Sequence, residues 1–203
     1  MRDEMHSVLQ QALKEQVALD KQGSRTSFDL PSSAVSAAAT VAFARMDERL
    51  LEWLASSAVT GEERLSGCCV TVALTWPARV VVAWVGDSRA VLCGRNGVAV
   101  DLTVDHRASG GMASRSETAR VQRCGGWISQ GRVLGLLAVT RALGDVEFKG
   151  GLAKTLADGV RDGFWKQERA AQARSLCVSA TVFSKVAPES AHARPQACEC
   201  PSV

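Results

Sequence analysis

The spacing of apolar residues changes once along this chain, and that change decides the fold class. Near the N-terminus, apolar residues recur every three or four positions over 5–19 and again over 34–54, as on one face of a helix. From Ser66 onward the chain instead has four short runs that are rich in β-branched residues. These runs are 68–76, 79–85, 90–93 and 98–102. Two helices followed by antiparallel strands predict an α+β architecture.

Turn residues divide the runs into hairpins. Residues 76–78 (Trp-Pro-Ala) predict a tight turn between the first two runs. Asn96 and Gly97 accept the positive φ of a two-residue hairpin turn between the last two. We therefore expect one four-stranded antiparallel meander. Ser32 or Ser33 is expected to cap the second helix by accepting a hydrogen bond from its first free amides.

The second half of the chain carries shorter elements. A short helix is expected over 116–124 and a hairpin over 127–134. Two Asp-Gly steps interrupt the helical spacing within 151–176, which predicts an insertion lying over the surface. Residues 178–183 are rich in β-formers and predict a further strand.

Length and charge limit the classes of function. A chain of 203 residues can bury roughly 70% of the surface that its unfolded form exposes. We expect one domain over 1–187 and a disordered tail over 188–203, where apolar residues are few. The formal charge of +3 does not favour nucleic acid or an anionic membrane as the main partner. Because no run approaches the roughly 18 apolar residues of a membrane span, we expect a soluble chain that has no targeting segment or has lost it.

Seven cysteines lie mostly inside apolar runs, as expected for reduced core thiols in an intracellular, reducing compartment. Cys198 and Cys200 could supply half of a zinc site. Tetrahedral zinc needs three or four ligands, however, and the nearest further candidate is His192. We therefore favour a solvated tail over a metal site at these residues.

A carboxylate follows the strand predicted over 79–85. Gly86 lets the chain turn sharply, so that Asp87 lies at the strand end, where its oxygens would suit a weak Mg²⁺ or Mn²⁺ site. Alternatively, Asp87 caps the turn and pairs with Arg89. From the spacing alone we favour the cap.

Two further polar motifs could each have either a functional or a structural role. His106 could act as a general base or metal ligand, but His6 and His192 lie in terminal segments, so no His cluster or nucleophilic triad can be built. We favour a role for His106 in anchoring its loop. Arg141 and Asp145 stand four residues apart and could form an ion pair that fixes the turn between them. Phosphate binding by Arg141 is the alternative that we rank lower.

In their order along the chain, these motifs resemble the metal-dependent protein serine/threonine phosphatases of the PPM family, the protein phosphatase 2C type. The similarity is close over 66–149 and weaker back to about residue 5. The segments that carry it are 66–67 (Ser-Gly), 85–92 with Gly-Asp-Ser-Arg, 102–106 (Leu-Thr-Val-Asp-His), Glu117 with 120–121 and 125–126, 132–135, and 137–149 with Arg-Ala-Leu-Gly-Asp.

The resemblance implies two antiparallel sheets packed face to face as a β-sandwich and flanked by helices. It also implies a dinuclear Mg²⁺ or Mn²⁺ centre, at which a metal-bound water attacks a phosphoserine or phosphothreonine of a phosphoprotein substrate. Family members hold the metals with an early Glu-Asp pair, an Asp-Gly-His-Gly-Gly motif and late Asp-Gly-x-Trp-Asp and Asp-Asn motifs. The sequence has none of these. Residues 162–165 (Asp-Gly-Phe-Trp) imitate the late motif, but Lys166 replaces its second Asp and the strand expected before it, 178–183, comes later.

Only Asp87 matches a metal-binding position of the family, because in some members the Asp of Gly-Asp-Ser-Arg helps to bind an additional, weaker ion. We therefore expect a catalytic domain truncated at both ends, with no catalytic residue assigned and little or no phosphatase activity. The alternative is a pseudophosphatase that docks a protein partner on unpaired strand edges. The sequence predicts no oligomeric state.

Overall fold

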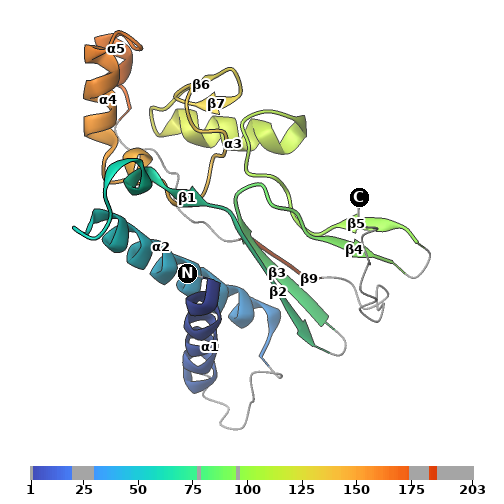
Figure 1. The fold of residues 1–203 in the computed structure, drawn as a ribbon. Helices are drawn as coiled ribbons and strands as arrows, with labels where there is room; N and C mark the ends of the chain where they lie inside the picture. Colours follow the sequence, from blue (N-terminus) through green and yellow to red (C-terminus); the bar gives the residue numbers. More distant parts are fainter. Residues whose placement is uncertain (1, 20–29, 77–78, 95–96, 174–182, 187–203) are drawn as a thin grey trace, which may run out of the picture.

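The computed structural model describes residues 2–19, 30–76, 79–94, 97–173 and 183–186. Two helices come first along these ranges, five strands follow them, and shorter helices and strands complete the chain. Every strand pair in these ranges is antiparallel, which confirms the α+β class (Figure 1). In chain order the elements are α1 (Arg2–Leu19), α2 (Ser32–Ala55), the 3-10 helix η1 (Gly61–Leu65), β1 (Gly67–Cys68), β2 (Val70–Trp76), β3 (Arg79–Val85), β4 (Val91–Cys93), β5 (Ala99–Asp101), α3 (Gly111–Arg123), β6 (Ile128–Ser129), β7 (Arg132–Val133), β8 (Leu143–Gly144), the 3-10 helix η2 (Val146–Phe148), α4 (Leu152–Arg161), α5 (Gln167–Ala170) and β9 (Phe183–Val186).

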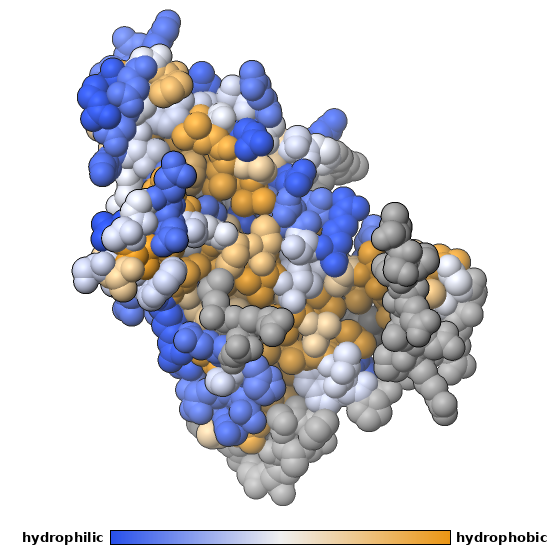
Figure 2. Space-filling view, viewed as in Figure 1, coloured by the Kyte–Doolittle hydropathy of each residue, from blue (hydrophilic) through white to orange (hydrophobic). Residues whose placement is uncertain are grey.

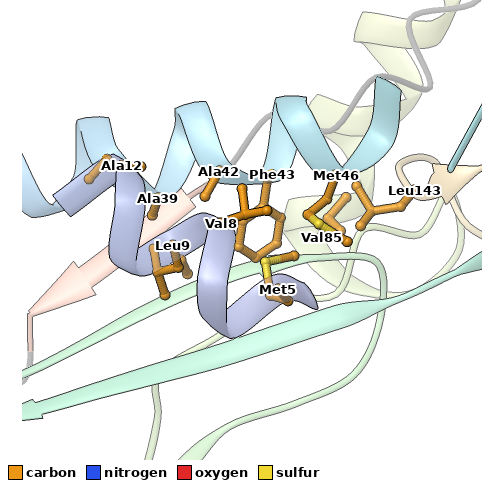
Figure 3. Close-up of a cluster of buried hydrophobic side chains, with 12 residues drawn as sticks. Met5, Val8, Leu9, Ala12, Ala39, Ala42, Phe43, Met46, Val85 and Leu143 are labelled. Carbon is orange, nitrogen blue, oxygen red and sulfur yellow. The ribbon is translucent and has the colours of Figure 1, made fainter. Parts of the chain in front are cut away.

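The two amphipathic helices predicted near the N-terminus are confirmed, and they share one apolar core. Phe43 of α2 lies beside Val8 of α1 (Figure 3). Further along α2, Met46 lies beside Val85 of β3 and Leu143 of β8 (Figure 3). This core therefore ties the helices both to the central sheet and to the short strand that carries the Arg-Ala-Leu-Gly-Asp motif.

The predicted serine cap of α2 is wrong. The residue before the helix is Pro31, which is extended (ψ 152°), and no side chain caps the helix. The Pro31 carbonyl instead accepts hydrogen bonds from the N–H groups of Ala34 and Val35 (3.0 and 3.1 Å). Ser32 and Ser33 therefore lie inside the first turn, because the fixed φ of Pro31 already sets the entry into the helix.

β3 is the central strand of the sheet β2-β3-β9 and is buried on both faces. Its side chains alternate between two partners, as the period of a strand requires. Val81, Ala83 and Val85 pack toward the helices, whereas Val82 and Trp84 pack against residues of the β4-β5 hairpin. Burial on both faces explains why the sequence of β3 is almost continuously apolar.

The prediction of a single four-stranded meander is wrong, because β3 and β4 do not pair. The four runs form two separate hairpins, β2-β3 and β4-β5. Between β3 and β4 the backbone bonds to the 102–106 segment instead. The Leu102 N–H donates to the Ala90 carbonyl (2.9 Å), and the Ala90 N–H donates to Thr103 Oγ1 (2.9 Å). These bonds turn the chain away from β3 before β4 begins.

A second apolar core lies in the segment after β5. Trp127, Phe148, Leu152 and Leu156 are buried there together, between α3, the β6-β7 hairpin, η2 and α4. The expectation that 151–176 only lies over the surface is thus wrong for α4. Its Leu152 and Leu156 occur one helical turn apart and face this core.

Other predicted elements differ in their bounds. The helix predicted over 116–124 is α3, which begins five residues earlier, at Gly111, and ends at Arg123. Of the strand predicted over 178–183, only Phe183 lies in the described ranges, at the start of β9. The tail predicted over 188–203 lies outside them. Among the described helices, none has the length and apolar character needed to cross a membrane.

Candidate functional site

The turn after β3 joins two of the sequence motifs. Gly86 has a φ of +94°, and a side chain on it would collide with Cys69. The Gly86 N–H donates to His106 Nδ1, and the Gly86 carbonyl accepts from the His106 N–H, both at 3.0 Å. The His106 ring also stacks on Trp84, with 6.0 Å between ring centroids. The loop-anchoring role predicted for His106 is therefore confirmed.

The environment of His106 keeps its imidazole uncharged at neutral pH. Burial, reinforced by the nearby positive charge of Arg141, lowers the pKa of His106 to about 4. A neutral ring can accept a hydrogen bond on Nδ1, which is what the Gly86 N–H requires. The residue thus serves the backbone of the turn as an acceptor.

Asp87 is held by partners other than the one predicted. Its Oδ1 accepts from Cys69 Sγ (3.2 Å) and its Oδ2 accepts from Arg107 Nε (2.6 Å). The predicted pair with Arg89 is wrong, because Arg89 binds both oxygens of Asp105 (2.7 and 2.9 Å). Burial acts to raise the pKa of Asp87, but the hydrogen bonds from Cys69 and Arg107 outweigh it and lower the pKa below its ordinary value.

Glu117 of α3 is the centre of a buried charge network. Its carboxylate accepts from Arg141 Nε and Nη2 (2.9 and 2.7 Å), from Arg120 Nη2 (2.8 Å) and from Thr140 Oγ1 (2.6 Å). Burial opposes ionisation, but these partners lower the pKa of Glu117 to about 2. The predicted Arg141–Asp145 pair is therefore wrong. The lower-ranked alternative, phosphate binding by Arg141, does not fit either, because its fork faces Glu117 and its side chain is only 6% exposed.

A third group of charges joins α2 to the Arg-Ala-Leu-Gly-Asp motif. Asp47 of α2 accepts from Lys149 Nζ (2.6 and 2.7 Å) and from the Gly144 N–H (2.9 Å). Asp145 follows in the left-handed conformation (φ 50°), with its carboxylate in the space that a side chain on Gly67 would fill. Burial raises the pKa of Asp145 to about 6, although Lys149 opposes the shift.

The described residues do not fit a dinuclear metal centre. Mg²⁺ and Mn²⁺ prefer several carboxylate oxygens that are free to coordinate. Asp87, Glu117 and Asp47 each face a cationic side chain instead. Within the described ranges, no three His, Cys, Asp or Glu side chains lie close enough together to hold a metal ion.

The other sequence-predicted candidates lie apart from these motifs. Asp162, in the segment that imitates the late motif, follows α4 and pairs with Arg161 on the exposed surface. Phe164 in the same segment is 76% exposed, and no strand leads into it. Residues 192–200, with the zinc candidates, lie outside the described ranges.

Glu117→Gln should destabilise the fold strongly at neutral pH. The substitution leaves the buried Arg141 without its counter-charge, so we expect a loss of about 3–5 kcal/mol in the free energy of unfolding at pH 7. The folded pKa of Glu117 is depressed to about 2 from an ordinary 4.5. Its stabilisation is therefore complete above pH 4.5 and lost as the pH falls through 2. Urea unfolding between pH 7 and 2 should show the gap to the wild type narrowing.

Glu168→Gln on the exposed surface of α5 is the matched control for this experiment. It should change the stability by less than about 0.5 kcal/mol at each pH. An equal loss in both variants, or a gap for Glu117→Gln that does not depend on pH, would contradict the role assigned to the network.

Asp145→Asn should have the opposite effect. The folded pKa of about 6 lies above the ordinary value of 3.8, so the ionised carboxylate destabilises the fold increasingly between pH 4 and 6. Asn removes the charge and tolerates the left-handed conformation. We expect a gain of about 1–3 kcal/mol at pH 8 and little gain at pH 4. Denaturant unfolding at the two pH values measures it, and an equal change at both would count against the assignment.

Comparison with known proteins identifies the family of this chain. The chain matches the family described as Protein phosphatase 2C over residues 2–194. Protein phosphatase 2C 57 of Arabidopsis thaliana is 39% identical over 137 residues, which are 67% of this chain and 34% of that protein. Protein phosphatase 2C 1 of Paramecium tetraurelia is 42% identical over 113 residues, which are 53% of this chain and 36% of that protein.

A solved structure supports the same fold. The structure of a C. elegans sex-determining protein superposes with a TM-score of 0.50 and 20% identity, covering 89% of this chain and 35% of that one. The chain spans about a third of the length of the curated relatives named above. The family match covers nearly all of it, and so the chain belongs to the protein phosphatase 2C family.

Proposed function

We propose that this chain is the scaffold of a metal-dependent protein serine/threonine phosphatase and that, as a 203-residue polypeptide, it does not hydrolyse phosphoserine or phosphothreonine. The observation that carries the proposal is that three carboxylates near the phosphatase motifs are paired with cations. Asp87 faces Arg107, Glu117 faces two arginines, and Asp47 faces Lys149. These ion pairs hold segments of the fold together. Because their carboxylates already bind cationic side chains, they are poorly suited to bind a catalytic metal pair.

The scaffold role follows from what each pair connects. The Glu117 network attaches the 137–145 segment to α3. Asp47 attaches the same segment to α2 through the Gly144 N–H, and it also binds Lys149, which follows the segment. The bonds between Gly86 and His106 attach the turn after β3 to the 102–106 segment. Together they fix the loops that follow the central sheet, the place where a rigid fold usually presents functional residues.

Asp87 is the carboxylate that we propose as the ligand of an accessory Mg²⁺ or Mn²⁺. Its side chain is 19% exposed, and it lies at the end of a rigid strand. A cation there competes with the Arg107 guanidinium for the same oxygens. Because one carboxylate with waters holds such ions weakly, we expect low affinity.

A protein-binding, pseudophosphatase role is the second candidate. It is favoured by the unpaired outer edge of β2 within the described sheet. Such an edge can bind another chain without any chemistry at the phosphatase motifs.

Phosphatase assays on the purified chain test the proposal. With a phosphothreonine peptide and Mn²⁺, we expect no turnover above the buffer rate, because Asp87, Glu117 and Asp47 are already paired with cations. Asp87→Ala serves as the site variant and Asp158→Ala, at an exposed pair on α4, as its control. Turnover that Asp87→Ala abolishes and Asp158→Ala preserves would refute the claim of inactivity.

Mn²⁺ titrations followed by paramagnetic NMR line broadening test the accessory site. Arg107→Ala removes the competing cation, so it should strengthen Mn²⁺ binding several-fold, with broadening centred on 86–89. Arg161→Ala removes an exposed arginine from a different pair and should leave the titration unchanged. Absence of broadening near Asp87 in both the wild type and Arg107→Ala would exclude the site.

A further inference from the structure

β2 forms the outer edge of the central sheet. It pairs with β3 along its whole length, from Val70 opposite Val85 to Trp76 opposite Arg79. On its other side, no strand of the described ranges pairs with it. In an antiparallel strand, every second residue directs its N–H and C=O away from the paired neighbour. The outer edge of β2 therefore presents a row of backbone donors and acceptors.

This edge lacks the features that usually prevent pairing between sheets. The sequence of β2, Val-Thr-Val-Ala-Leu-Thr-Trp, contains neither a charged residue nor proline. Its register with β3 runs without a bulge. Natural edge strands are commonly protected by lysine, proline, bulges or very short length. An uncharged, regular strand of seven residues has none of these protections.

Apolar surface continues beside the strand. A pocket of about 550 Å³ lies between β2 and α1, with Met5 and Leu9 in its wall. A second pocket of about 850 Å³ lies beside β1 and the end of α2, and it includes Trp53, which is 55% exposed. The two pockets share Cys68. Figure 2 shows the hydrophobic surface as a band over β1 and β2.

We propose that β2 pairs with β2 of a second copy of this chain, antiparallel across a two-fold axis, so that the two sheets become one. The residue pattern of β2 is self-complementary in this arrangement. In a register centred on Ala73, Val72 lies opposite Leu74, and Val70 lies opposite Trp76. Apolar side chains then meet on one face of the sheet.

The other face of β2 is self-complementary as well. Thr71 lies opposite Thr75 of the partner copy, and Thr–Thr pairs across strands are favourable. No charge faces a like charge anywhere along the pairing, because β2 has none. A two-fold axis brings the same surface of both copies together. A β2–β2 dimer can therefore form only if β2 is complementary to itself. This contact needs none of the phosphatase motifs and is independent of whether the chain hydrolyses a phosphoprotein.

Sedimentation equilibrium of the full chain over a range of concentrations tests the dimer. The wild type should approach twice its 21.5 kDa mass as the concentration rises. Ala73→Lys places two lysines opposite each other at the axis and should raise the dimer dissociation constant at least about tenfold. Val91→Lys adds the same charge to an exposed position on β4 and should leave it unchanged.

Hydrogen exchange on the wild type gives a second readout that does not depend on the folding of a variant. The amides of β2 that point away from β3, on every second residue of 70–76, should exchange more slowly at high than at low protein concentration, while those in 79–85 should not change. A wild type that stays monomeric up to its solubility limit would overturn the proposal. A dimer that Ala73→Lys leaves intact, or concentration-dependent protection confined to segments other than β2, would do so as well.

Discussion

The burial of β3 on both faces is the constraint on which the rest of the structure depends. One face of the strand can be covered only by the helices and the other only by the β4-β5 hairpin, because its side chains alternate between them. The chain must therefore leave the sheet directly after β3 and return on the opposite face. Gly86 forms the turn through its positive φ. His106, which follows the β4-β5 hairpin, holds this turn by accepting a hydrogen bond from the Gly86 N–H.

Local periodicity was sufficient to predict the helices and hairpins but insufficient to predict how they pack. The two incorrectly predicted ion pairs both join near neighbours in sequence: Asp87 with Arg89, and Arg141 with Asp145. Their true partners stand 20 and 24 residues away, on other elements. Spacing along one segment carries no information about such contacts, because they depend on how separate elements are brought together.

The same limit explains the residues that sequence reasoning missed. Arg107 and Asp47 belong to a loop and a helix whose own patterns give no sign of a charged partner. Glu117 was noted only through the family resemblance. The meander failed for a related reason: nothing near β3 indicates that the 86–90 segment will bond to 102–106 instead of continuing the ladder. The family motifs predicted the fold correctly, because a set of motifs in a fixed order identifies a whole fold and therefore its long-range contacts. A single segment does not.

The space shared by Gly67 and Asp145 has a consequence for how sequences of this fold can change. A methyl group at 67 would occupy the volume of the Asp145 carboxylate, so position 67 cannot carry a side chain while that carboxylate stays in place. A substitution at 67 therefore requires a smaller or displaced side chain at 145. Position 145 is less constrained than position 67, because a side chain of equal or smaller size, such as Asn, leaves Gly67 undisturbed.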